Sequence, residues 1–506
     1  MAQFDIKWSE LMRVGGHVNR VYPVAYSDFY TTRYQGTRLY SSLYLTNHSG
    51  FKETAKGKVA PKLDRGFGII EQVELIKNTP IVFISDKKDG VHKMYYQKYS
   101  SACEPIGLPK EITSYEMPRQ RKRKGDFWIH FSANKQFFCI DYEIPGSKTE
   151  HDRFGYRVYS DEFELISQGE YELPYPSRLV TITNNHVSNN GNYFLTAKVY
   201  KDDDSRKLFK SLDNLEKVVL IHITPEGMEE FDLELEDEKR ISDLSIGSNE
   251  QGILTFTGLY GNKKGGTKGA FFYKFDYQNK KVLVRSWKPF YEVSDMDDWT
   301  EKDLKREKKL EKKGRSMLDL HQFDIRDLYE LEDGSLIGMI ERYYVRVVTT
   351  YDQQTNRSST TYYYHYEDIK VYKINPGGEI MWIKDIPKRQ VSANDDGYLS
   401  SFSSFVTGGK LYVMFNDNLK NYNESSGIYE TGDAPFTANY RKKKNTVALV
   451  EMDLENGDYT RKSYFGRKET EALAVPKKFV LNPDKKELTM ILRIGKKEKY
   501  GILSLE

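Results

Sequence analysis

The feature that most constrains this chain is a unit of four short segments that recurs along its length. Within 178–235 the four segments are Arg178–Thr183, Tyr193–Tyr200, Val218–Ile223 and Met228–Leu235. Apolar and polar residues alternate in them, and turn residues such as Asn190-Gly191 and Pro225-Glu226-Gly227 separate them. Alternation with a period of two, bounded by turn residues, predicts β-strands. This stretch therefore predicts one set of four antiparallel strands.

The same unit recurs in six further stretches of the sequence. They are Val18–Val59, Gly68–Ile112, Phe127–Leu173, Ile241–Trp287, Phe323–Ile386 and Tyr398–Phe465. Residue pairs that contain glycine, such as Asp333-Gly334 and Gly377-Gly378, supply hairpin turns, where a positive φ is needed. Leu473–Glu506 supplies about three more strands, and Phe4–Trp8 is a strand without a unit of its own. We expect this N-terminal strand to complete the last unit and remove its exposed edge.

Repeated four-stranded units with periodic aromatic residues are typical of a β-propeller, in which each unit is one blade. We predict an all-β chain in which 1–506 form a single propeller of four-stranded antiparallel blades, closed by the N-terminal strand. The count gives eight blades, or alternatively seven, because Val18–Val59 is the least regular unit. Two stacked β-sandwiches are the alternative architecture.

Length and composition agree with a repeat and exclude other classes. A chain of 506 residues exceeds the roughly 250 to 300 residues at which a single core stops growing. The balance of 77 Lys+Arg against 74 Asp+Glu gives no general case for nucleic-acid binding. Two cysteines, Cys103 and Cys139, are too few for a disulfide-stabilised scaffold of this length. They either form one disulfide or remain two buried thiols.

The sequence leaves the location of the protein open. No apolar run approaches the roughly 18 residues that a membrane-spanning helix needs, so we expect no transmembrane segment. The first residues, Met1–Asp5, lack the basic and apolar regions of a signal peptide. The protein is therefore either cytoplasmic or the mature form of an exported chain whose signal peptide has been removed.

One insertion breaks the strand pattern at 291–317. Asp298–Gly314 predicts a charged helix, with a capping box formed by Thr300 and Asp303. This helix is either a solvated insertion or a docking arm for a partner, and Trp299, Lys305 and Lys309 are its candidate contact residues. A second basic run, Arg119–Lys124, is predicted to be a solvated loop.

A tyrosine-rich hairpin spans 343–366 and is predicted to project beyond an ordinary blade. Exposed tyrosine is favoured at protein interfaces, so this hairpin is the leading candidate for a partner-binding surface. Its candidate contact residues are Tyr343, Tyr344, Tyr362, Tyr363, Tyr364 and Tyr366.

The sequence contains none of the common catalytic or metal-binding motifs. Phosphate-binding loops, paired-histidine zinc motifs, nucleophile elbows and calcium-loop spacings are absent. We therefore predict a protein that is not an enzyme and has no catalytic residues, cofactor, metal or identifiable small-molecule substrate. A hydrolase acting on carbohydrate or peptide in the propeller channel is the alternative, and a carbohydrate-binding propeller is the second.

A series of short motifs within 323–421 carries a family resemblance. It consists of Tyr366–Asn375, Gly378–Trp382, Ile386–Gln390, Ser400–Phe402, Phe415–Asp417 and Asn421. The series resembles a large, mostly uncharacterised group of envelope and secreted β-propellers from Bacteroidota-type bacteria, and more weakly the periplasmic plug-type propeller subunit of the type IX secretion translocon. The resemblance implies a periplasmic or secreted location, with a removed signal peptide.

Within these motifs, Lys388, Gln390, Asn416, Asp417 and Asn421 are polar residues at strand ends of adjacent blades. We expect them to form a hydrogen-bonded network between blades or, alternatively, a ligand site. The sequence as a whole predicts a non-catalytic scaffold that binds a protein partner in the bacterial envelope, with an outer-membrane translocon as one candidate partner.

Overall fold

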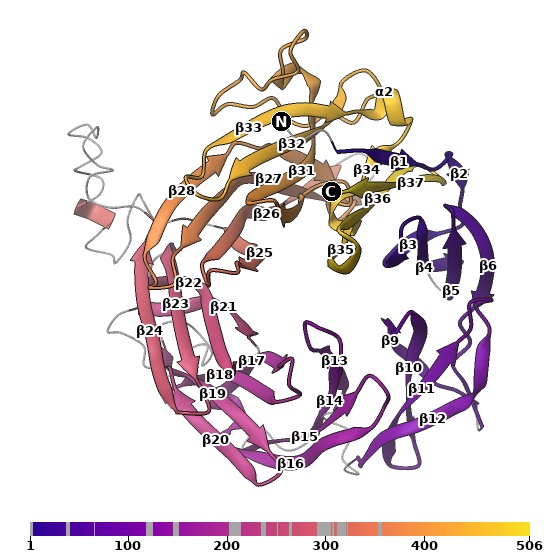
Figure 1. Ribbon diagram of the computed structural model, residues 1–506, viewed down its shortest axis with the longest axis vertical. Helices are drawn as coiled ribbons and strands as arrows, with labels where there is room; N and C mark the ends of the chain where they lie inside the picture. The colour runs from indigo at the N-terminus through magenta and orange to yellow at the C-terminus, as the bar shows by residue number, and fades with distance from the viewer. Residues whose placement is uncertain are drawn as a thin grey trace. The chain divides into compact units, whose positions relative to one another are not determined.

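The computed structural model describes residues 4–505 apart from 37–40, 65, 118–124, 145–150, 202–213, 234–238, 250, 263–265, 291–304, 306–307, 311–319, 321 and 353–356. The described chain is built from consecutive antiparallel sheets, in most of which the strands lie side by side in chain order (Figure 1). It forms two compact units. Unit 1 comprises 1–59, 101–103 and 321–506, and unit 2 comprises 60–100 and 104–320.

Unit 2 contains four sheets of four strands each. The first consists of β9 (Ile69–Ile76), β10 (Thr79–Lys88), β11 (Val91–Tyr99) and β12 (Pro105–Glu116). The second consists of β13 (Phe127–Phe131), β14 (Phe137–Ile144), β15 (His151–Ser160) and β16 (Leu165–Pro176). The third consists of β17 (Val180–Val187), β18 (Tyr193–Tyr200), β19 (Leu215–Thr224) and β20 (Gly227–Asp232). The fourth consists of β21 (Lys239–Ser248), β22 (Ile253–Asn262), β23 (Thr267–Asp276) and β24 (Lys281–Pro289). A short pair, β7 (Lys62–Leu63) and β8 (Gly66–Phe67), precedes them, and the 3-10 turn η1 (Ser177–Leu179) precedes β17.

Unit 1 also contains four sheets. The first is β3 (His17–Ala25), β4 (Asp28–Gly36), β5 (Ser41–Ser49) and β6 (Lys52–Lys58). The second is β25 (Phe323–Glu330), β26 (Leu336–Asp352), β27 (Arg357–Ile374) and β28 (Ile380–Ile386), with β29 (Gln390–Ala393) added beside β27. The third is β30 (Ser403–Thr407), β31 (Lys410–Asn418), β32 (Asn445–Asp453) and β33 (Tyr459–Phe465).

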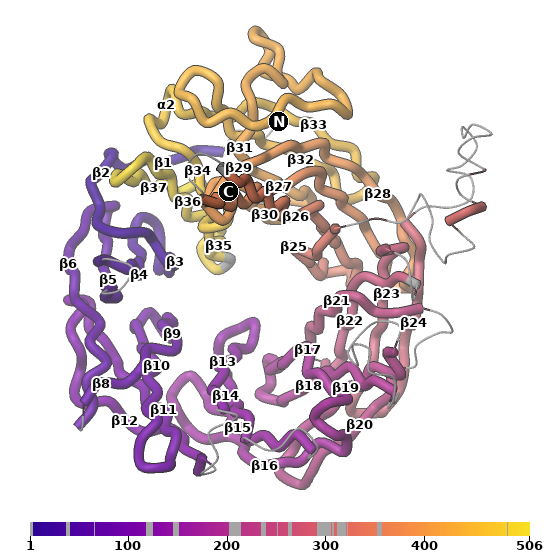
Figure 2. Tube along the Cα trace, turned by 180° about the vertical axis from the view of Figure 1, so that it is seen from behind, coloured from indigo at the N-terminus to yellow at the C-terminus, as the bar shows by residue number. Residues whose placement is uncertain are grey.

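The last sheet of unit 1 joins the two ends of the chain. It holds β34 (Leu473–Ala474), β35 (Val480–Asn482), β36 (Glu487–Ile494) and β37 (Lys497–Ser504), and β1 (Ile6–Trp8) and β2 (Met12–Arg13) both pair with β37. Figure 2 shows β1 beside β37 from the opposite side. The short helical segments of this unit are α2 (Arg467–Thr470), η4 (Leu419–Asn421), η5 (Pro476–Lys478) and η6 (Pro483–Lys485).

The fold class predicted from the sequence is confirmed. The described residues form eight sheets of at least four antiparallel strands, which is the blade pattern of a β-propeller, and the strands match the eight predicted units. The least regular predicted unit, Val18–Val59, forms the complete sheet β3–β6. Pairing of Ile6 with Leu503 confirms that the N-terminal strand completes the last sheet. The extent of one domain over 1–506 stays a prediction.

Two predicted insertions fall largely outside the described residues. Of the predicted helix at 291–317, only Lys305 and 308–310 are described, and they are helical. The basic run Arg119–Lys124 lies outside the described residues. Cys103 and Cys139 are both buried free thiols.

Apolar side chains between neighbouring sheets form the cores of each unit. In unit 1, Ile337 and Val371 of the second sheet pack with Val413 and Val450 of the third. Met414 and Leu449 then pack with Met490 and Leu503 of the last sheet, whose Ile491 and Tyr500 contact Val18 and Phe29 of the first. Because the middle strands face a neighbouring sheet on both sides, they are buried along nearly their whole length, as in β31 and β36. Aromatic rings fill part of this space, and those of Phe29 and Tyr500 lie 4.8 Å apart.

The packing of β1 on β37 predicts a strong effect at Gly501. A Cβ added there would lie 2.5 Å from the Trp8 ring and 3.0 Å from Met490, whereas a Cβ at Gly247 would meet nothing within 4 Å. We expect Gly501→Ala to lower the free energy of unfolding by about 1 to 3 kcal/mol, since overpacking forces the neighbours to move. Chemical denaturation measures this, with Gly247→Ala as the matched control. Equal stability of the two variants would contradict the close packing of β1.

Burial of histidines predicts a loss of stability in acid. Burial, together with the nearby Arg33 charge, lowers the pKa of His48 to about 3. The neutral form is therefore favoured in the folded state, and the stability it contributes is present above about pH 6.5, the unfolded value, and is lost as the pH falls towards 3.

We expect His48→Gln, which keeps a polar side chain beside Thr31 but does not titrate, to reduce the drop in unfolding free energy between pH 7 and pH 4. The control is His151→Gln at a side chain that is 40% exposed. Denaturation at several pH values is the measurement, and an acid dependence of His48→Gln equal to that of the original chain would refute the prediction.

Candidate functional site

The second sheet of unit 1 carries a hairpin that is much longer than its neighbours. Strands β26 and β27 pair from Leu336↔Ile374 out to Asp352↔Arg357. Strand β25 pairs with β26 as far as Arg342, and β29 pairs with β27 over Tyr363–Tyr366. No other described strand pairs with residues 344–352 and 357–362, which we call the outer hairpin. It is a two-stranded ribbon without a neighbouring described strand, and at Tyr362 the amide donates to Asn394 Oδ1 and the carbonyl accepts from the Asn394 amide, both at 3.0 Å.

One face of the outer hairpin exposes apolar side chains. Val345 and Val347 alternate on β26, and the register places Tyr364 and Tyr362 opposite them. Val345 is 38% exposed, Val347 55% and Tyr362 45%. On the other face, the Tyr344 ring stacks on His365 at 4.4 Å, and Tyr363 is 37% exposed.

The six predicted contact tyrosines therefore divide into two groups. Tyr366 is buried, and its ring lies 4.7 Å from that of Tyr343, with the Arg326 guanidinium over both rings. These two belong to the base of the hairpin. Tyr362 and Tyr363 are exposed, and Tyr344 and Tyr364 are half-buried. Lys305 and Lys309 of the predicted arm are exposed, and Trp299 lies outside the described residues.

Beneath the hairpin, a buried ion pair begins a chain of polar contacts. Lys388 Nζ lies 2.8 Å from Glu341 Oε1, and both side chains are fully buried. Arg326 and the Ser401 hydroxyl donate to the second oxygen of Glu341, at 3.0 and 2.7 Å. Burial lowers the pKa of Lys388, and the Glu341 carboxylate opposes that shift. Lys388 Nζ also donates to Gln390 Oε1 at 3.1 Å.

Two amide side chains carry this chain of contacts across the sheets. Gln390 donates to the carbonyl of Asn416 at 2.9 Å, and its own oxygen accepts from the Ser401 amide at 2.7 Å. Asn416 Nδ2 donates to the carbonyls of Leu399 and Ala474, at 2.9 and 2.8 Å. These bonds join the second, third and last sheets of unit 1.

A second buried ion pair lies in the third sheet. Arg461 pairs with Asp417 and donates to the carbonyl of Pro387, which follows β28. Asp417 also accepts from Asn421 at 2.8 Å and from Tyr422 at 2.6 Å. We call Glu341, Lys388, Gln390, Asn416, Asp417 and Arg461 the buried polar network.

In the structure, the five predicted polar residues therefore make hydrogen bonds with other residues of this chain. Lys388, Gln390, Asn416, Asp417 and Asn421 are all buried, and their hydrogen bonds end on side chains and carbonyls of neighbouring strands. Charged and amide groups that are satisfied in this way act as links between sheets.

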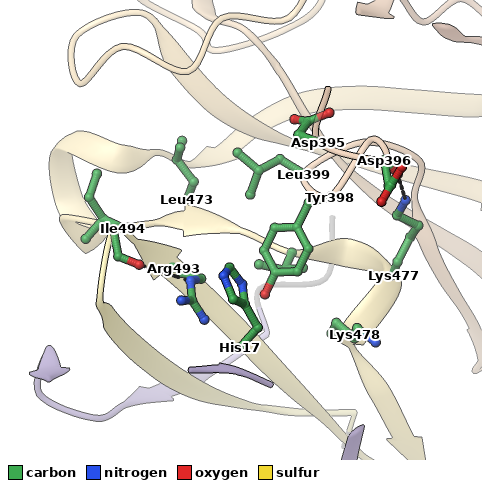
Figure 3. Close-up of a pocket in the computed structure, with 12 residues that line it drawn as sticks. His17, Asp395, Asp396, Tyr398, Leu399, Leu473, Lys477, Lys478, Arg493 and Ile494 are labelled. Carbon is green, nitrogen blue, oxygen red and sulfur yellow. Dashed lines mark hydrogen bonds between the residues drawn. The ribbon is translucent and has the colours of Figure 1, made fainter. Parts of the chain in front are cut away.

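The network borders a pocket of about 760 Å³ in unit 1 (Figure 3). One wall is the loop 394–399, whose Leu399 carbonyl is held by Asn416, and another is the segment Leu473–Lys478, held through Ala474. The apolar lining is Leu399, Leu473, Val475 and Ile494. His17, Tyr398 and Arg493 converge in the middle of the view, with Lys478 below them.

Hydrogen bonds join the base of the hairpin to residues that line the pocket. Tyr364 donates from its hydroxyl to Asp396 at 2.6 Å, a bond that raises the pKa of Tyr364 to about 12. Lys477 donates to Tyr366 Oη at 3.3 Å and to the Asp396 carbonyl at 3.2 Å. Asp395 accepts from Ser392 and from the Gly397 amide, as in an Asx turn.

Two buried arginines share one carboxylate, and one of them, Arg493, lines the pocket. Arg33 Nη2 and Arg493 Nη1 bind the two oxygens of Glu498, at 2.6 and 2.7 Å. Arg33 and Glu498 are almost completely buried, and Arg493 is 8% exposed. Partial burial and the Arg493 charge lower the pKa of His17, whose ring lies 5.9 Å from that of Tyr398.

The sequence alone did not single out the pocket as a site. His17 comes from β3 near the start of the chain, whereas Lys477, Lys478 and Arg493 come from its last part, and packing between the first and last sheets of unit 1 brings them together. Within the part of the chain that the structure describes, no group of three or more His, Cys, Asp or Glu side chains is placed to hold a metal ion. None of the described helices is long and apolar enough to span a membrane.

Comparisons with known proteins show likeness of fold only. No protein-family model matches the chain, and no curated protein matches it in sequence. Among solved structures, it is similar to the WD40 domain of SCAP from fission yeast, at 8% identity and a TM-score of 0.39 over 99% of this chain and 98% of the other. The Dos1 propeller is similar at 9% identity and a TM-score of 0.43, over 99% and 95% of the two chains. A prolyl endopeptidase is similar at 9% identity and a TM-score of 0.36, over 96% of this chain and 54% of the other.

The buried polar network predicts unequal effects of the same substitution at two lysines. Lys388→Met leaves Glu341 buried without its ammonium partner, and we expect it to cost about 3 to 5 kcal/mol of unfolding free energy. Lys410→Met breaks the pair with Glu451 at a lysine that is 38% exposed, and should cost far less, because solvent screens that pair. Denaturation of both variants is the measurement. A Lys388→Met protein as stable as Lys410→Met would show that the network does not hold the sheets.

Proposed function

We propose that this protein is a non-catalytic binding scaffold of the β-propeller class, and that it recognises a protein partner through the outer hairpin and the pocket beside it. The observation that carries the proposal is the two-stranded outer hairpin, which has no neighbouring described strand and exposes Val345, Val347 and Tyr362 on one face. An open strand edge offers backbone donors and acceptors to an extended segment of a partner, and exposed aromatic residues are favoured at interfaces.

The buried polar network supports the same proposal. A binding surface needs a rigid base, because ordering flexible segments on binding costs affinity. Glu341, at the base of β26, is held by Lys388, Arg326 and Ser401, and β29 pairs with the base of β27. The hairpin therefore projects from a fixed support.

The location and the identity of the partner form the finer part of the proposal. A periplasmic or secreted location in a Bacteroidota-type bacterium, with an outer-membrane secretion translocon as partner, rests on the sequence resemblance alone. Fractionation of the native host tests it: recovery of the protein in the cytoplasmic fraction would contradict the envelope location.

The hydrolase alternative has no specific contact in its favour. Asp395 and Asp396, the carboxylates at the pocket, accept hydrogen bonds from Ser392, the Gly397 amide and Tyr364. They act as loop and hairpin anchors in this arrangement.

Site-specific crosslinking tests the binding surface. A photo-crosslinking amino acid placed at Val347 should give a discrete adduct with a native-host protein, and the same residue at Val282, an exposed valine of β24, should not. The adduct should disappear when Tyr362→Asp is added, since a charge on that face opposes apolar contact, while the thermal unfolding temperature stays the same. Identical adducts from positions 347 and 282, or none from 347, would overturn the role of the hairpin.

A further inference from the structure

The charges around the pocket do not balance. Arg33 and Arg493 share the single carboxylate of Glu498, so this buried group carries one excess positive charge. Arg33 is 3% exposed, and its Nη1 has no hydrogen-bond partner among the described residues. Burying a charge without an opposite charge is costly, and a bound anion would remove that cost.

The other charged residues that line the pocket are two lysines, Lys477 and Lys478, and two carboxylates, Asp395 and Asp396, so the excess of one positive charge remains. Lys478 Nζ donates to the carbonyl of Asn19 at 2.6 Å, and Lys477 donates to a tyrosine hydroxyl and a carbonyl. All of these acceptors are neutral. Burial lowers the pKa of Lys478, and the nearby Arg20 lowers it further. An anion between Arg493 and Lys478 would meet positive charge on both sides.

A third group near the pocket is a hydrogen-bond donor. The hydroxyl of Tyr398 is buried and makes no hydrogen bond of normal geometry in the described structure. Figure 3 shows it beside the His17 ring, with Arg493 on the other side of that ring in this view. A hydroxyl, a guanidinium and an ammonium are donors, and together they match a carboxylate better than any cation.

Apart from these charged groups, Tyr398 and His17, the lining of the pocket is apolar. Leu399, Leu473, Val475 and Ile494 line it, and its volume of about 760 Å³ lies in the range of roughly 300 to 1,000 Å³ typical of sites for small ligands. The ligand should therefore combine one negative charge with an apolar body. A single excess positive charge suits a carboxylate better than a doubly charged phosphate.

We propose that this pocket captures the C-terminal carboxylate of the protein partner, with the partner's apolar last side chain seated on Leu473, Val475 and Ile494. The inference rests on the proposed function, because it takes the ligand to be part of a protein. The base of the outer hairpin lies beside the pocket, since Tyr364 donates to Asp396 and Tyr366 accepts from Lys477. A partner segment lying along the hairpin would end in the pocket.

Titration calorimetry with short peptides tests the proposal on the full chain. The probe is the acetylated tetrapeptide Gly-Ala-Ala-Leu with a free carboxylate, compared with its C-terminal amide. We expect the free acid to bind at least tenfold more tightly than the amide. Lys478→Met should weaken binding of the free acid by about fivefold or more, and Lys485→Met, at an exposed lysine of η6, should leave it unchanged. Leu473→Trp, which fills the pocket, should abolish binding; if that variant does not fold, Lys478→Met decides alone.

Three results would overturn the proposal. They are equal binding of acid and amide, no binding of the free acid, and binding of decanoate without binding of the peptide, which would make the ligand a fatty acid. The tetrapeptide does not require the outer hairpin, so its binding should survive Tyr362→Asp. If the peptide binds but position 347 gives no adduct, the role of the hairpin is contradicted and the pocket proposal stands. If position 347 gives an adduct but the peptide does not bind, the pocket proposal is contradicted and the role of the hairpin stands.

Discussion

The side chain of Asn416 makes two hydrogen bonds on which the candidate site depends. One goes to the Leu399 carbonyl and the other to the Ala474 carbonyl, and these residues belong to the two walls of the pocket. A buried carbonyl that loses its donor is costly, so both walls are held at the distance that one amide group spans. The carbonyl of Asn416 itself accepts from Gln390, which extends the link to the sheet that carries the long hairpin.

The apolar cores and the polar network have different roles in unit 1. Contacts such as Val371 with Val413 supply most of the stability, because burial of apolar area is the main favourable term in folding. Apolar contacts alone tolerate small slips of one sheet against another. The ion pair of Lys388 with Glu341 and the directional bonds of Gln390 fix the relative placement of the sheets, which a binding surface made from several of them requires.

Much of the fold could be predicted from the sequence because a blade is a local structure. Alternation and turn residues over about 50 residues mark each sheet, and glycines such as Gly334 and Gly378 take the positive φ that the turns need. The pairing of Phe4–Trp8 with the C-terminal strands was also accessible, since it follows from the missing strand of the last unit. The long hairpin was visible for the same reason, as both of its strands are contiguous in sequence.

The candidate site was less accessible, because its parts meet only through packing between sheets. Lys388, Gln390 and Asn416 stood out as polar residues at strand ends, but their partners Glu341 and Ser401 carry no pattern that marks them as buried. Tyr366 could not be told from Tyr362 by sequence, although one is buried at the hairpin base and the other is exposed. The sharing of Glu498 by Arg33 and Arg493 joins positions about 460 residues apart, and no local periodicity reveals it.

The central claim is that one buried amide holds both walls of the pocket. Hydrogen–deuterium exchange of the Asn416→Leu variant tests it most directly, because exchange reports local opening of each segment separately. The account predicts faster exchange in both 394–401 and 473–478, segments far apart in the chain, with no change in strands β9–β12 of unit 2. Unchanged exchange in either wall, or an equal increase throughout the chain, would contradict it.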